Sequence, residues 1–82
     1  MQGTISHINP QSNLIAVLTD EREYSIFELV NGDEIETGDE VSWNGDAPMG
    51  SEIVTNHTQS ALIEVYFCDH HLQASQLRSQ LF

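Results

Sequence analysis

Short segments rich in β-branched, aromatic and other apolar residues recur along most of this chain, and turn-forming residues separate them. The separating segments contain the Pro, Gly, Asn, Asp or clustered charged residues that are typical of turns and loops. Several short strands at regular spacing favour an all-β barrel or sandwich over an α/β fold. The predicted strands are Thr4–Asn9, Leu14–Leu18, Tyr24–Leu29, Val41–Trp43, a strand that begins at Ile53, and Ala61–Phe67, which extends the sheet.

The last part of the chain has a different character. Residues 72–81 include no Gly or Pro and consist largely of good helix formers, which predicts a short helix. Leu77 and Leu81 lie one helical turn apart with Ala74 on the same side, and Asp69 is placed to cap the helix. The helix either closes the barrel or binds a partner. Packing on the barrel is favoured, because an isolated helix of this length is marginal in water.

The length of 82 residues is sufficient for one compact domain. We therefore expect a barrel over residues 1–68 and a helical tail over residues 69–82 that packs on it.

The order of several short motifs resembles that of the bacterial cold-shock domains, which are small OB-fold proteins that bind single-stranded nucleic acid. That family opens with the strand Gly-Thr-Val-Lys-Trp-Phe-Asn, and its fourth strand is entered through Gly-Gln-x-Val-x-Phe. The similarity spans about residues 1–57, and nothing after Gln59 corresponds. It implies a five-stranded OB-type barrel, to which this chain adds a C-terminal strand extension and a short helix. The matching residues are Gly3, Thr4, Ile5, Ile8, Asn9, Ile35, the segment Gly38–Trp43, Pro48, Gly50 and Asn56.

The residues with which that family binds nucleic acid are largely replaced. Where the family has Lys-Gly-Phe-Gly-Phe-Ile, this chain has Ser12–Val17, so the lysine and two rings are absent. Tyr24–Glu28 takes the place of Val-Phe-Val-His-Phe, and His7 takes the place of the first-strand tryptophan. Base stacking contributes roughly 1–3 kcal/mol per base, so this loss removes most of the free energy of a weak binder.

An apolar sheet face with an acidic rim is expected to remain, and such a surface is suited to binding a protein. We expect it to consist of His7, Leu14, Ala16, Tyr24 and Phe27, of which only His7, Phe27 and Tyr24 keep a ring for stacking. Two alternatives stay open. The C-terminal segment can fold over this face, or the face can retain weak binding of single-stranded RNA or DNA.

Charge opposes nucleic acid as the partner. Thirteen acidic residues face two basic ones, Arg22 and Arg78, which gives a formal net charge of −11 without any lysine. Such a field repels polyphosphate and favours basic proteins. The sequence leads us to expect neither a signal peptide nor a membrane-spanning apolar run. The chain is therefore predicted to be a cytoplasmic protein, a monomer or weak homodimer, with a protein as its partner; the charge favours a basic one.

No pattern for catalysis or cofactor binding is found. Cys68, His70, His71 and His57 are potential zinc ligands, but their spacing does not fit a zinc site, since adjacent histidines on a strand point to opposite faces. The acidic pairs lack the alternating ligands of a calcium loop. No phosphate-binding glycine loop or nucleophile motif occurs. We predict a non-enzymatic binding module without metal or cofactor.

Overall fold

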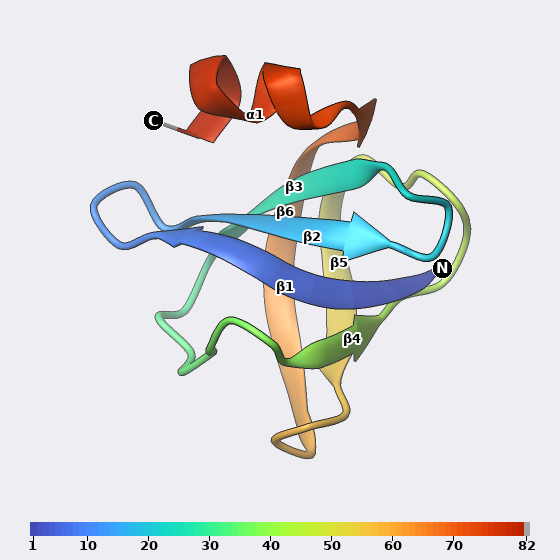
Figure 1. Cartoon of the computed structure of the whole chain (residues 1–82). Coiled ribbons are helices and arrows are strands. Elements are labelled where there is room, and N and C mark those ends of the chain that lie inside the picture. Colours follow the sequence, from blue (N-terminus) through green and yellow to red (C-terminus); the bar gives the residue numbers. More distant parts are fainter. Residues whose placement is uncertain (82) are drawn as a thin grey trace.

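The computed structural model describes residues 1–81 and shows a closed antiparallel β-barrel followed by one helix (Figure 1). The barrel has six strands rather than the predicted five, because the chain after the fifth strand forms a full barrel strand and not merely an extension. The all-β fold class is confirmed, and the barrel is compatible with an OB-like fold. The elements are β1 (Gln2–Asn9), β2 (Leu14–Thr19), β3 (Tyr24–Leu29), β4 (Glu40–Ser42), β5 (Gly50–Asn56), β6 (Ala61–Leu72) and α1 (Ala74–Leu81).

The strands follow the order β1-β2-β3-β6-β5-β4 around the barrel, and β4 closes it by pairing with β1. In Figure 1, β1, β2 and β3 run across β5 and β6. At Gly3, β1 lies so close to β2 that a Cβ atom would clash with the carbonyl oxygen of Leu18. The glycine of the opening motif is therefore required by this contact between strands.

The barrel interior is filled by alternate residues of the strands, as period-2 geometry requires. Along β6, for example, Ile63, Val65 and Phe67 are buried while their neighbours Leu62, Glu64 and Tyr66 are exposed. The interior cluster contains Ile5, Ile15, Val17, Phe27, Leu29, Val41, Trp43, Val54, Ile63, Val65 and Phe67.

The acidic linker between β3 and β4 is tied to the barrel at its far end. Gly38 adopts a left-handed φ of 94° and donates its N–H to the carbonyl of Ile5, whose own N–H donates to the carbonyl of Asp39. The buried Asp39 carboxylate accepts hydrogen bonds from the Asn56 and Gln59 amides, each at 2.8 Å, and from the backbone N–H of Glu36 at 3.0 Å. This network joins the linker to β5 and to the β5–β6 turn.

β6 runs through residue 68, where we placed the end of the barrel, and continues to Leu72, which pairs with Tyr24. Its pairing with β3 shifts register twice, and His71 adopts a positive φ of 58°. Because these irregularities break the alternation, His70 stacks on Phe67 while Leu72 packs in the cluster outside the barrel. The direction in which α1 leaves the barrel is set here.

Candidate functional site

The sheet face that the sequence singled out is covered by α1. Leu77 and Leu81 of the helix are buried together with Ala16 of β2, Ile26 of β3 and Leu72. Leu14 and Tyr24 are half-buried and pack against the same cluster. Figure 1 shows α1 beyond the end of β6, alongside β3 and β2. The tail therefore occupies the face, which was one of the two alternatives left open by the sequence.

Two local features hold α1 there. The side-chain amide of Asn9, at the end of β1, donates to the carbonyl oxygen of Leu81 at 2.5 Å. At the start of the helix, the side chain of Gln76 accepts a hydrogen bond from the backbone N–H of Gln73 at 2.7 Å, which is half of a capping box. Asp69 does not cap the helix as we expected, because β6 extends past it and its carboxylate accepts from the N–H of His70.

Phe27 lies on the opposite side of the sheet from the other four predicted residues. Its side chain is fully buried in the barrel interior, where it meets Phe67 in a T-shaped contact with ring centroids 5.5 Å apart. The outer position belongs to Ile26, which packs in the cluster under α1. Phe27 is therefore not available to a ligand on this face.

His7 is the exposed member of the predicted set. Its Nδ1 is hydrogen-bonded to the Ser6 hydroxyl at 2.8 Å, and its ring centroid lies 6.4 Å from that of Tyr24. Ala16 is fully buried under the helix. The structure thus brings together His7, Leu14, Ala16 and Tyr24, but it leaves only the His7 end of the face open.

The four potential metal ligands do not converge. His70 is buried and hydrogen-bonds Ser25 and the carbonyl of Pro48, whereas His57 bonds Ser42. His71 is exposed and pairs with Glu23, and the hydrogen bond that its Nδ1–H donates to that carboxylate raises the pKa of the imidazole. Within residues 1–81, no group of three or more His, Cys, Asp or Glu side chains is arranged to hold a metal ion.

Cys68 is exposed on the outside of β6. Partial burial raises the pKa of its thiol, and the negative charges of Glu28 and Asp69 raise it further. A raised pKa lowers the thiolate fraction at neutral pH, and the thiolate is the nucleophilic form. The environment of Cys68 is therefore the opposite of that of a catalytic cysteine.

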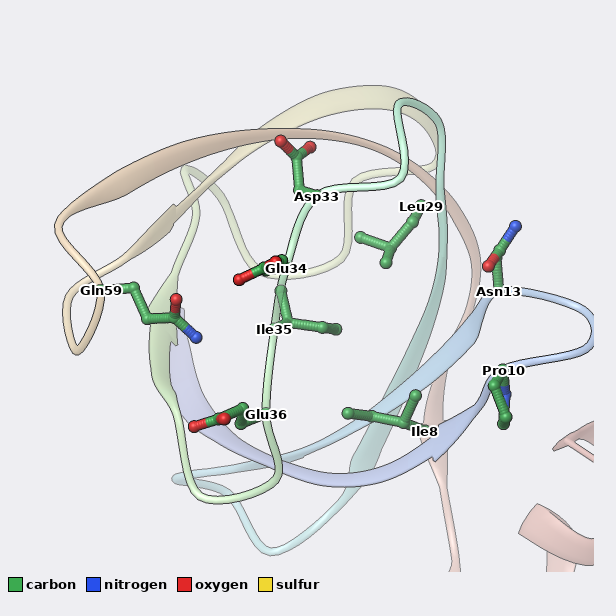
Figure 2. Close-up of a pocket in the computed structure, with 9 residues that line it drawn as sticks. All are labelled: Ile8, Pro10, Asn13, Leu29, Asp33, Glu34, Ile35, Glu36 and Gln59. Carbon is green, nitrogen blue, oxygen red and sulfur yellow. The ribbon is translucent and has the colours of Figure 1, made fainter.

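A pocket of about 360 Å³ opens where the β3–β4 linker passes over one end of the barrel. Figure 2 shows Ile8, Leu29 and Ile35 forming its apolar part, whereas the linker contributes the carboxylates of Asp33, Glu34 and Glu36. Pro10, Asn13 and Gln59 complete the lining. An apolar floor with an acidic rim suits the stem and charge of a basic side chain. Sequence reasoning missed this pocket because its walls come from four separate segments. The only signal was Ile35, an isolated apolar residue in an acidic linker.

No protein-family model, curated protein or solved structure matches this chain. Within residues 1–81, no helix has the length and apolar character needed to cross a membrane, since α1 has only eight residues.

Proposed function

We propose that this chain is a small, acidic, non-enzymatic binding module of cold-shock-like descent that recognises a basic protein in the cytoplasm. The observation that carries the proposal is the burial of Leu77 and Leu81 on the outer face of β2 and β3. A helix at this position competes with any base for the sheet surface. Stacking platforms are already few there, so the face has little to offer a polynucleotide.

The charge of the chain supports the same proposal. A formal net charge of −11 repels phosphates and accelerates encounters with cationic proteins. The acidic pocket beneath the β3–β4 linker adds a concave site of the same sign. Neither feature needs a catalytic group or a cofactor.

Weak binding of single-stranded RNA or DNA is the second candidate function. One observation favours it: His7 is exposed and lies close to Tyr24, so two rings remain near one another at the open end of the face. It requires a strand of nucleic acid to approach a strongly negative surface, which is unfavourable at any distance within the Debye length.

Fluorescence anisotropy separates the two functions. A labelled peptide that alternates arginine with leucine should form a saturable one-to-one complex at physiological salt, and the complex should weaken as salt is raised. Labelled oligo-uridine and oligo-thymidine should leave the anisotropy unchanged even at low salt, where attraction to phosphates would be greatest. Oligonucleotide binding that is reduced by His7→Ala would favour the second function and contradict the first.

A further inference from the structure

The outer surface of the barrel on β5, β6 and the residue after β3 carries four large apolar side chains that are exposed to solvent. The exposed fractions are 51% for Val30, 54% for Ile53, 72% for Leu62 and 51% for Tyr66. Val30 directly follows β3, Ile53 lies on β5, and Leu62 and Tyr66 lie on β6; β3, β6 and β5 are neighbours in the barrel. We call this surface, with the Glu28 and Glu64 side chains that lie in it, the β6 face.

Strand register places a carboxylate in the middle of the apolar groups. Glu64 of β6 pairs with Ile53 on one side, and on the other side its carbonyl accepts the N–H of Val30 at 3.4 Å. Two residues further along β6, Tyr66 pairs with Glu28 of β3. The β6 face is thus a small patchwork in which two acidic side chains alternate with apolar ones.

No cation neutralises these carboxylates within residues 1–81. The two arginines are Arg22, in the β2–β3 turn, and Arg78, on α1, and neither is paired with Glu64 or Glu28. Glu64 instead accepts one hydrogen bond, at 3.0 Å, from the side-chain amide of Asn31. That contact holds the carboxylate in place without cancelling its charge.

The free-energy cost of burying an unpaired carboxylate decides which kind of partner can cover the β6 face. A purely apolar partner would remove water from Glu64 and Glu28 and leave both charges unpaired, which is costly. A second copy of this chain would bring like charges together, because each copy carries a net charge of −11. A partner with basic and apolar side chains in alternation avoids both penalties. Its apolar groups would cover Ile53 and Leu62, while a guanidinium would pair with Glu64 and stack on Tyr66.

We propose that the β6 face docks a cationic protein segment in which arginine or lysine alternates with apolar side chains. The proposal rests on the proposed function, since it names the surface and the partner chemistry of the same binding module. It assigns the contact to the outer surface of β5 and β6 and requires no displacement of α1 from β2 and β3.

The test measures binding of the labelled arginine–leucine peptide to the full chain and to two pairs of variants. Leu62→Ser and Glu64→Gln should each weaken binding about tenfold, which corresponds to roughly 1.4 kcal/mol. The matched controls, Leu18→Ser on β2 and Glu21→Gln in the β2–β3 turn, should leave the affinity unchanged. All four positions are exposed, and an unchanged thermal midpoint for each variant verifies folding.

A second measurement on the unmodified chain locates the peptide directly. Amide chemical shifts should move on β3, β5 and β6, and those of α1 should stay in place. A peptide that alternates arginine with serine, of the same charge, should bind at least about tenfold more weakly, because it cannot cover the apolar groups.

The outcomes distinguish the two proposals. If Leu18→Ser and Glu21→Gln weaken binding as much as Leu62→Ser and Glu64→Gln, or if the arginine–serine peptide binds equally well, the negative field alone attracts the peptide. Docking at the β6 face is then contradicted, whereas the proposed function stands. If the full chain binds no basic peptide, both are wrong. The β6 face is also overturned if Leu62→Ser abolishes self-association in sedimentation, or if oligo-uridine shifts the same amides.

Discussion

Asp39 shows how one buried polar side chain organises the barrel end. Burial opposes ionisation of its carboxyl group, but hydrogen bonds from Asn56, from the backbone N–H of Glu36 and from Gln59 outweigh that effect and hold its pKa below the ordinary value of 3.8. Three donors on one carboxylate oxygen favour the charged form strongly. The folded state is therefore stabilised by ionisation of this group.

We predict that Asp39→Asn lowers the free energy of unfolding by about 1–3 kcal/mol at neutral pH, the typical cost of disrupting a buried hydrogen-bond acceptor. A carboxyl with a depressed folded pKa stabilises above its unfolded pKa, and this contribution disappears as pH falls through the folded value. The difference between wild type and variant should therefore shrink below about pH 3.8. Urea titrations across this range measure it, with the exposed Asp33→Asn as control. A difference independent of pH would contradict the assignment.

Residue patterns predicted part of the candidate site and missed part of it for a physical reason. Leu14, Ala16 and Tyr24 do share one side of the sheet, since alternation within β2 and pairing with β3 place them there. Phe27 does not, because Ile26 and Phe27 are both apolar and their order alone does not reveal which one faces inward. A one-residue slip moves every side chain of a strand to the other face.

β6 and α1 form the element pair that the sequence described least completely. The predicted strand ended at Phe67, whereas β6 continues to Leu72 through a segment of Cys, Asp and His that lacks apolar alternation. That extension is stabilised by pairing with β3, which is distant in sequence. The helix itself was readable from its composition and its Leu77–Leu81 spacing. Its position over β2 and β3 depends on the irregular path around His71.

We predict that Leu77→Ala releases α1 from the sheet without unfolding the barrel. Truncating a buried leucine typically costs about 2–5 kcal/mol, more than a helix of eight residues is expected to supply by itself. Hydrogen exchange should accelerate at the amides of α1 and remain slow on β3 and β6, and Tyr24 should become more exposed. Ser75→Ala, on the exposed side of the helix, should change neither. Uniform loss of protection across the barrel would show instead that the helix and barrel unfold as one unit.

At the scale of the whole molecule, the turn and strand pattern predicted an all-β barrel or sandwich, and the structure is a closed barrel. The turn and strand pattern did not predict the full length of the sixth strand or the acidic pocket, because both depend on contacts between segments far apart in the chain. The excess of acidic residues produces electrostatic repulsion that acts across the whole molecule. With a Cα radius of gyration of 11.1 Å, the eleven excess charges lie close enough to repel one another at low salt.

We predict that sodium chloride raises the thermal midpoint of this chain, because screening reduces self-repulsion more in the compact state than in the unfolded one. A gain of about 1 kcal/mol corresponds to a rise of roughly 4–8 °C for a domain of this size. Circular dichroism at low and moderate salt measures it. The thermal midpoint of a variant that carries both Asp33→Asn and Glu34→Gln should rise less with salt, because this variant has two fewer negative charges. A midpoint that falls with salt would mean that attractive ion pairs dominate.

Closure of the barrel has a consequence for recognition. Every strand from β1 to β6 already has a hydrogen-bonded neighbour on each side. Within residues 1–81, no strand therefore presents a whole free edge along which a peptide or another copy of the chain could add a strand, and the segments without a ladder partner are short. Selectivity for a partner is therefore expected to depend on side chains. Single substitutions can then change the selectivity without disturbing the hydrogen bonds between strands.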